Sequence, residues 1–334
     1  MPKRILFLYY NKPTDESFDN IIKSLEGDQE IEVIKGSLLR EFGLRMDLID
    51  YRRVSQFIKS FPALDGLVVG DIFWGTGQNI CSWCVENGVK CFFLQHGQWI
   101  YTGNKQDAVY CPTAIYLLGN KVRDVASQWP LSKCTKLVVT GSPRYDGAMA
   151  DRSNGGYVYF APPVVEEQSH SGAVKRNPKV VTWLSELKGL DKHCQLVIHP
   201  HYREADIEIY TQVFPQAQIV AKEANAIFLI KQCDRLLTHR LSTMVLDGLA
   251  CKKRIILINF GEYDGISYYN RGYFGDMAIE TSSANEVLNL ARIPFLENDL
   301  PDDVYCEQCK PYIWLGNASQ RVITEIKSEL FGNV

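Results

Sequence analysis

Residues 233–260, CDRLLTHRLSTMVLDGLACKKRIILINF, constrain the fold of this chain more than any other stretch. They predict a short apolar strand over 235–238, a polar turn over 239–242, a helix over 243–251 and a second strand over 254–259. Short apolar strands on either side of a crossover helix are the unit of a parallel α/β sheet. The stretch therefore predicts an α/β protein.

The turn in this unit lies between the carboxyl end of a strand and the amino end of a helix. Free backbone N–H groups and the positive helix end favour an anion at such a place. Arg240, Ser242 and Thr243 add side-chain donors there. We therefore expect the turn to hold a phosphate group of a nucleotide-activated substrate.

Similar strand and helix patterns fill the rest of the 334 residues, a length that suits two hydrophobic cores. Residues 150–156, ADRSNGG, are small, polar and glycine-rich, which is typical of a linker. The chain is therefore predicted to form two Rossmann-like domains, residues 1–150 and 151–334, that face a central cleft. Ligands bind at the carboxyl ends of the strands on each side of such a cleft.

Composition narrows the class of protein. The net charge of −3 and the pI of about 6.1 provide no basic face for nucleic acid. The uninterrupted apolar runs are far shorter than the roughly 20 residues of a membrane span. The first residues, MPKRILFLYYNKP, predict a β-strand rather than a signal peptide. We expect a cytoplasmic protein that associates at most peripherally with the inner face of the membrane.

The ten cysteines are scattered, and most of them lie in apolar segments. In a reducing compartment such residues are small, buried free thiols. We expect this state for Cys91, Cys134, Cys194, Cys233 and Cys251. Two pairs, Cys81 with Cys84 and Cys306 with Cys309, have the spacing of zinc ligands, but the first pair lies in a predicted helix. No metal site is expected, and a zinc site built from both pairs is the minor alternative.

Polar side chains that can carry chemistry gather where the predicted strands end. In the first domain the candidates are Asp71, Gln95, His96, Gly97, Gln98 and Arg144. In the second domain they are His199, His201, Arg203, Arg240, Ser242, Thr243 and Glu262. Because parallel strands end at one edge of their sheet, the candidates of each domain are expected to lie close together.

Each candidate of the first domain also has a purely structural interpretation. His96 could be a satisfied core histidine, although Gly97 after it allows a ligand to approach the backbone. Asp71 could cap the helix that follows it or act in catalysis. Arg144 could pair with Asp146 in a structural turn or bind substrate.

The second domain has a basic loop after the strand 195–198. Pro200 biases His199 to an extended conformation, which fixes the direction of its imidazole. His199, His201 and Arg203 suit a phosphate or a carboxylate better than a metal, because no third metal ligand is near them in the sequence. Glu262 follows the last strong strand and could contact a ribose or sugar hydroxyl.

Several of these motifs, in this order, resemble those of the GT-B glycosyltransferase superfamily of bacterial surface polysaccharide synthesis. The pattern is most similar to the CDP-glycerol glycerophosphotransferases of teichoic acid synthesis, and the Kdo (3-deoxy-manno-octulosonic acid) transferases of capsule and O-antigen assembly look related. The matching stretches are QHG (95–97), VTGSPRYD (139–146), YFAPP (159–163), VIHPHYRE (197–204), residues 233–258 and LGNASQRVITEI (315–326). Two departures stand out: THRLS replaces Thr-Asp-Tyr-Ser-Ser, and APPVV replaces a segment that ends in arginine.

The resemblance implies a metal-independent and cofactor-free transferase that moves a sugar or a polyol phosphate from a nucleotide-activated donor. The donor would be a cytidine nucleotide such as CMP-Kdo, and the acceptor a growing glycan or lipid-linked glycan of capsule, O-antigen or lipopolysaccharide. The second domain would bind the donor, with Arg240 neutralising phosphate charge, and His96 or Asp71 would be the base toward the acceptor in the first. The alternatives are a nucleotide-sugar epimerase or hydrolase on the same fold, and a non-catalytic glycan-binding protein.

Overall fold

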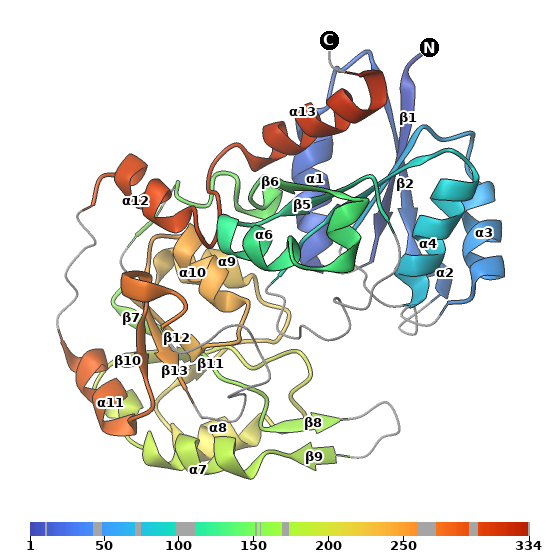
Figure 1. Cartoon of the computed structure of the whole chain (residues 1–334). Helices are drawn as coiled ribbons and strands as arrows, with labels where there is room; N and C mark the ends of the chain where they lie inside the picture. The colour runs from blue at the N-terminus through green and yellow to red at the C-terminus, as the bar shows by residue number, and fades with distance from the viewer. Residues whose placement is uncertain are drawn as a thin grey trace. The chain divides into compact units, whose positions relative to one another are not determined.

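The computed structural model of the chain describes residues 1–10, 12–42, 49–70, 75–97, 111–150, 152–153, 155–168, 174–259, 272–293 and 300–332. They form two compact units, Met1–Gly147 with Cys306–Val334 and Ala148–Tyr305. Each unit is built on a six-stranded parallel sheet with helices around it (Figure 1). The prediction of an α/β protein with two Rossmann-like domains is confirmed.

The first unit has the strand order β2-β1-β3-β4-β5-β6. Its strands are β1 (Lys3–Tyr9), β2 (Ile31–Ser37), β3 (Gly66–Gly70), β4 (Lys90–Leu94), β5 (Ala114–Leu117) and β6 (Lys136–Val139). Its helices are α1 (Lys12–Ser24), α2 (Leu38–Phe42), α3 (Tyr51–Lys59), α4 (Gly75–Glu86), α6 (Asn120–Ala126) and α13 (Ala318–Phe331), with 3₁₀ turns η2 (Pro130–Lys133) and η3 (Pro143–Tyr145). The β3 strand is buried along its whole length, as a central parallel strand should be.

The second unit has the strand order β11-β10-β7-β12-β13-β14. Its strands are β7 (Tyr157–Ala161), β10 (Gln195–Ile198), β11 (Gln218–Ile219), β12 (Arg235–His239), β13 (Arg254–Ile258) and β14 (Ile279–Thr281). A separate hairpin pairs β8 (Glu166–Gln168) with β9 (Val174–Arg176). The helical elements are α7 (Pro178–Glu186), η4 (Leu190–Lys192), α8 (Glu208–Val213), α9 (Ala226–Gln232), α10 (Met244–Ala250), η5 (Gly275–Met277) and α11 (Ala284–Arg292), and α12 (Asp302–Cys309) spans the boundary between the units.

The strand orders locate one special position in each sheet. Counted along the chain, the second sheet has the order 3-2-1-4-5-6 of a Rossmann fold, so the order reverses between β7 and β12. The first sheet has the order 2-1-3-4-5-6, and its order reverses between β1 and β3. Open α/β sheets bind ligands outside the carboxyl ends of their strands at this switch point.

The end of the chain belongs to the first unit, which differs from the predicted domain 151–334. The apolar face of α13, with Val322 and Ile326, is buried in the core that also contains Phe7 and Phe18. Asp146 fixes the start of this helix, because its carboxylate accepts hydrogen bonds from the backbone N–H groups of Ala318 and Ser319 over 2.7 and 2.8 Å. Figure 1 shows α13 beside α1.

The segment that precedes α13 packs closely against the backbone of the first unit. Gly141 has a φ of +77°, and a Cβ placed on it would lie 1.9 Å from the Trp314 carbonyl oxygen. A Cβ on Gly119 would lie 2.4 Å from the Tyr312 backbone. The segment that leads into α13 therefore crosses the ends of β5 and β6 in direct backbone contact with two glycines.

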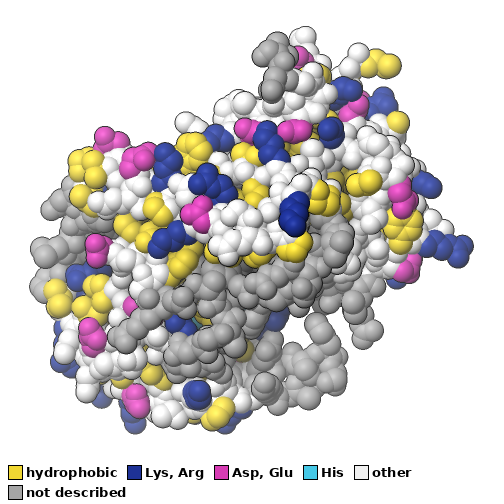
Figure 2. Space-filling model, viewed as in Figure 1, with side chains coloured by type: hydrophobic (Ala, Val, Ile, Leu, Met, Phe, Trp, Pro, Cys, Tyr) yellow, Lys and Arg dark blue, Asp and Glu magenta, His cyan; other side chains and the backbone are white. Residues whose placement is uncertain are grey.

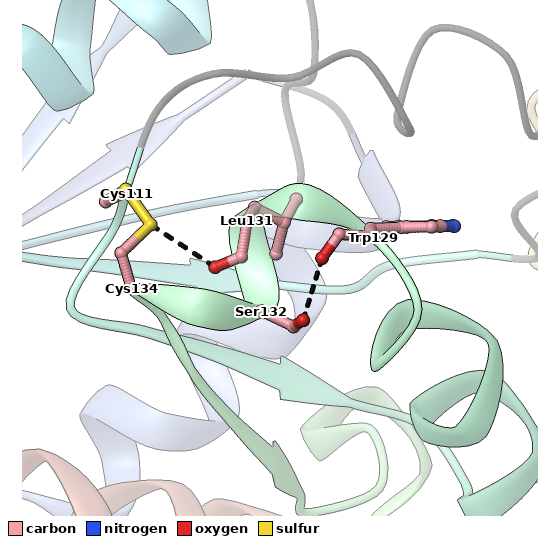
Figure 3. Close-up of a disulfide and its surroundings, with 5 residues drawn as sticks. All are labelled: Cys111, Trp129, Leu131, Ser132 and Cys134. Carbon is pink, nitrogen blue, oxygen red and sulfur yellow. Dashed lines mark hydrogen bonds between the residues drawn. A yellow bond between two sulfur atoms is a disulfide. The ribbon is translucent and has the colours of Figure 1, made fainter.

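One cysteine prediction is wrong. Cys134, expected to be a free thiol, forms a disulfide with Cys111 (Figure 3). The two residues precede the adjacent parallel strands β5 and β6, which brings their Cα atoms to 5.5 Å, a separation that a disulfide spans. Cys91, Cys233 and Cys251 are free and buried, as predicted, and Cys194 is free and half-buried.

On the face shown in Figure 2, basic and acidic side chains are interspersed over the described surface. None of the described helices is long and apolar enough to cross a membrane. No three His, Cys, Asp or Glu side chains are grouped as metal ligands in the described part of the chain.

Candidate functional site

Three of the predicted site residues, Asp71, Gln98 and Glu262, lie outside the described residues. The others in the second unit follow two strands, β10 and β12, and both of these strands pair with β7. They therefore lie along one carboxyl edge, on either side of the β7 end. These residues are His199, His201 and Arg203 after β10, and Arg240, Ser242 and Thr243 after β12.

His199 is held by the protein itself. Its exposed fraction is 9%, and its Nε2 donates to the Lys222 carbonyl oxygen over 3.1 Å. Because a carbonyl only accepts, Nε2 carries the proton and Nδ1 accepts from the hydroxyl of Tyr159. With both ring nitrogens used internally, His199 positions the loop 199–204 and has no ring nitrogen left for a ligand.

Glu204 anchors the other end of this loop and was not among the predicted site residues. Its buried carboxylate accepts hydrogen bonds from the backbone N–H groups of Val165 and Glu166 over 2.7 and 2.9 Å and from the Tyr210 hydroxyl over 2.9 Å. Burial and the adjacent Glu204 charge raise the pKa of the Tyr210 hydroxyl. Lys222, whose carbonyl oxygen accepts from His199, also donates from its side chain to the Glu204 carbonyl oxygen. Lys222 therefore contacts both ends of the loop.

Between these anchors the loop presents His201, Tyr202 and Arg203. His201 is half-buried, and its Nδ1 accepts from the Arg203 backbone N–H over 3.2 Å, so Nε2 carries the proton and is a donor. The ring of Tyr202 is 67% exposed and lies 4.4 Å from the His201 ring, centroid to centroid. The Arg203 Nε donates to the Tyr202 hydroxyl over 2.9 Å, which keeps this guanidinium at the exposed end of the loop.

The turn after β12 differs from the predicted anion site in one respect. The first N–H groups of α10 are used within the turn: Met244 donates to Ser242 Oγ over 3.2 Å, Val245 to the Ser242 carbonyl over 3.2 Å and Leu246 to the Thr243 carbonyl over 2.9 Å. The expectation of free helix-start amides is therefore wrong. The reason is that the Ser242 side chain and the carbonyl groups of Ser242 and Thr243 accept these hydrogen bonds.

Side chains add polar groups at this edge. Pro162 and Pro163 follow β7 and have no N–H group to offer a ligand. Arg240 is 6% exposed, and its backbone N–H extends the ladder with β13 by donating to the Ile258 carbonyl over 3.2 Å. Burial, followed by the charge of His201, lowers the pKa of His239 to about 4. His239 ends β12 and His201 lies in the loop after β10, on either side of the β7 end.

In the first unit, the predicted site residues Gln95 and Gly97 are held by hydrogen bonds within the protein. Gln95 is fully buried; its Nε2 donates to the Gly97 carbonyl over 2.8 Å and its Oε1 accepts from the Leu118 N–H over 3.0 Å. Gln95 therefore clamps the QHG turn to the end of β5. Gly97 is buried and contributes its carbonyl to the clamp.

His96 lies at the switch point of the first sheet. Its Nδ1 lies 3.1 Å from the hydroxyl of Tyr10, which follows β1. A Cβ on Gly70, the last residue of β3, would lie 2.4 Å from the Tyr10 ring, so three strand ends meet here. Sequence reasoning missed Tyr10, although its position at the end of the central strand RILFLYY was the available signal.

Arg144 forms an ion pair with a helix of its own unit. Its Nε donates to the Glu16 carboxylate of α1 over 2.6 Å, and its guanidinium lies 5.5 Å from the centre of the Tyr145 ring. The suggested pairing with Asp146 is wrong, because the Asp146 carboxylate caps α13. Arg144 thus fastens η3 to α1, and Asn20 of the same helix donates to the Pro143 carbonyl over 2.8 Å.

Solved structures show what this architecture is similar to. The structure of S. aureus MnaA with UDP is 13% identical, covers 98% of this chain and 97% of its own, and has a TM-score of 0.64. The UDP-GlcNAc 2-epimerase of Neisseria meningitidis bound to UDP-GlcNAc is 11% identical, with 97% and 99% coverage and a TM-score of 0.59. The wall teichoic acid polymerase TagF is 12% identical, with 99% and 90% coverage and a TM-score of 0.57.

No protein-family model matches the sequence, and no curated protein matches it. The fold likeness nevertheless extends over nearly the whole chain, in MnaA with UDP, in a UDP-GlcNAc 2-epimerase and in the wall teichoic acid polymerase TagF. The chain therefore has the GT-B fold that glycosyltransferases share with UDP-GlcNAc 2-epimerases, as its motifs predicted.

Proposed function

We propose that the protein is a GT-B transferase that moves a sugar or a polyol phosphate from a nucleotide-activated donor to a glycan or lipid-linked glycan acceptor. Ala148–Tyr305 would bind the donor and Met1–Gly147 the acceptor. A cytidine nucleotide such as CMP-Kdo is the first donor to test, on the motif resemblance, with UDP-GlcNAc and CDP-glycerol next. The acceptor would belong to a bacterial surface polysaccharide such as capsule or O-antigen, made at the inner face of the membrane.

The observation that carries this proposal is the set of basic side chains at the switch point of the second sheet. His201 and Arg203 come from the loop after β10 and Arg240 follows β12, on either side of a β7 end without N–H donors. Guanidinium and imidazole donors suit phosphate oxygens. In a transfer they would also stabilise the charge that develops on the leaving nucleotide phosphate.

The proposed roles differ for the individual residues. Arg240 and His201 would contact phosphate directly, while His199 would act only by holding their loop. In the first unit, His96 would be the base toward the acceptor hydroxyl, positioned by Tyr10, and Asp71 would be the alternative base. If the transfer retains configuration, Asp71 would instead be the nucleophile.

The binding half of this proposal is tested by the melting temperature with CMP, CDP, UDP and GDP, since a ligand that binds only the folded state raises it. Arg240→Ala and His201→Ala should weaken binding of the best nucleotide about tenfold or more. The matched controls are Arg254→Ala and His193→Ala, at the amino ends of β13 and β10 in the same sheet. Equal binding by the two pairs of variants would rule out this edge as the phosphate site.

The epimerase alternative is favoured by one observation: the structures similar over the whole length of both chains include UDP-GlcNAc 2-epimerases. The two reactions differ in their need for an acceptor. Incubation of the donor alone should leave it intact if the protein is a transferase, apart from slow hydrolysis. Full-rate conversion of donor in the absence of any acceptor would establish the epimerase or hydrolase instead.

A further inference from the structure

His239 has a position that sequence reasoning did not assign to a site. It ends β12, whose pairing with β7 runs from Arg235 to Thr238 and stops there. Thr238 closes this pairing, because its hydroxyl donates to the Ala161 carbonyl over 2.8 Å. His239 is thus the first residue of β12 beyond the β7 ladder, at the switch point where open α/β sheets bind ligands.

The imidazole of His239 is incompletely satisfied. Its Nδ1 is buried and has no hydrogen-bond partner among the described residues. The residue as a whole is only half-buried, so part of it lies at the surface of the unit. Buried polar atoms are nearly always paired in native proteins, and an unpaired one requires a specific cause. At a ligand-binding edge the simplest cause is a partner that belongs to the ligand.

The charge of the ring limits which ligand group that partner can be. Burial and the neighbouring His201 lower the pKa of His239 to about 4, so the ring is neutral near pH 7. A neutral imidazole has one donor and one acceptor nitrogen. A hydroxyl group can satisfy either nitrogen, whereas an ionised phosphate can only accept. The phosphate would be left to the charged guanidinium of Arg240 and to the Nε2 donor of His201.

We propose that His239 binds a hydroxyl group of the nucleotide-activated donor and so helps to select it. The hydroxyl belongs either to the ribose or to the transferred sugar or polyol. The inference rests on the proposed function and adds to it a specificity residue that contacts an uncharged part of the donor.

The test is calorimetric titration of wild type, His239→Phe and His239→Asn with the best-binding nucleotide, its 2′-deoxy analogue and its sugar conjugate. His239→Phe keeps a flat ring without nitrogen atoms and should weaken binding of the conjugate about tenfold, the value of one hydrogen bond. His239→Asn keeps a donor and an acceptor and should restore most of the affinity. His193→Phe, at the other end of the sheet, should change nothing.

The arms of the experiment separate the two sources of the hydroxyl. If it is the ribose hydroxyl, His239→Phe also weakens binding of the free nucleotide, and the 2′-deoxy analogue shows no such loss. If it belongs to the transferred group, only the conjugate loses affinity. Both results support the inference.

Two results would overturn it. One is equal affinity of wild type and His239→Phe for all three ligands. The other is uptake of about one proton on binding to wild type but not to His239→Phe, measured in two buffers of different ionisation enthalpy, because this would show that a phosphate protonates the ring. Failure of wild type to bind any nucleotide or conjugate would instead overturn the proposed function itself.

Discussion

The carboxyl edges of the two parallel sheets occupy equivalent positions in equivalent folds, yet the side chains along them differ in their hydrogen bonding. In the first unit, Gln95 is fully used within the protein and Arg144 is paired with Glu16. In the second unit, the Nδ1 of His239 has no hydrogen-bond partner among the described residues. The fold thus fixes where the carboxyl edge of each sheet lies, while local hydrogen bonding decides which side chains along it are already engaged.

The largest effect is expected where the carboxyl edge of the first sheet meets the segment before α13. Gly141→Ala places a Cβ 1.9 Å from the Trp314 carbonyl oxygen, at a φ of +77°. It should lower the free energy of unfolding by roughly 3 kcal/mol or more, since backbone atoms must move. Gly147→Ala is the matched control: its φ is +73°, but no atom lies within 4 Å of the added Cβ. Equal losses in denaturant titrations of the two variants would show that this contact contributes nothing.

The disulfide is a second feature of the first unit. Cys111 and Cys134 close a loop with a sequence separation of 23. Loop-closure entropy puts the stabilisation at about 3 kcal/mol as an upper value. Dithiothreitol should therefore lower the melting temperature of wild type but leave Cys134→Ser unaffected. A melting temperature of wild type that does not respond to the reductant would contradict the disulfide.

His239 should make the stability of the folded protein depend on pH. The pKa of His239 is about 4 in the folded protein and its ordinary value is 6.5. As the pH falls below 6.5, the unfolded chain takes up this proton first, so the free energy of unfolding falls until about pH 4. Between pH 7 and pH 5 the loss should be about 2 kcal/mol. It should be absent in His239→Phe, and parallel pH profiles of the two proteins would refute the lowered pKa.

The smallest effect concerns the anchor of the loop 199–204. Tyr159→Phe removes the hydroxyl that donates to His199 and should cost about 1 kcal/mol of stability. It should also weaken nucleotide binding a few-fold, because the loop carrying His201 and Arg203 loses a support. Tyr157→Phe is a useful comparison: it removes a hydroxyl bonded to the Leu229 carbonyl, at the other end of the same strand. A loss of affinity as large in Tyr157→Phe would argue against a specific role of the anchor.

Much of the fold could be predicted from local patterns. The apolar runs at 4–10 and 254–259 and the glycine-rich linker at 150–156 were sufficient to indicate two parallel α/β halves. The destination of α13 could not be predicted, because an amphipathic helix shows that it has a buried face but not which core receives it. Cys134 was misjudged for a related reason, since its partner Cys111 is brought near only by the pairing of β5 with β6.

The site shows the same division. Strand ends marked His199, His201 and Arg240 correctly as residues of one edge, but the sequence did not reveal that His199 is fully bonded to Tyr159 and Lys222. In THRLS, His239 stands where the family motif has aspartate, and an imidazole can carry a positive charge. Its burial in the structure removes that charge, because desolvation disfavours the protonated ring.

The return of the chain to its first unit has a consequence for synthesis. Ala148–Tyr305 is contiguous and contains all its strands, so it can complete its core as soon as it leaves the ribosome. Met1–Gly147 is made earlier but lacks α13, whose Val322 and Ile326 fill part of its core. The core of the first unit therefore cannot be completed until α13 is translated, after the entire second unit. Until then the apolar residues that α13 covers stay exposed.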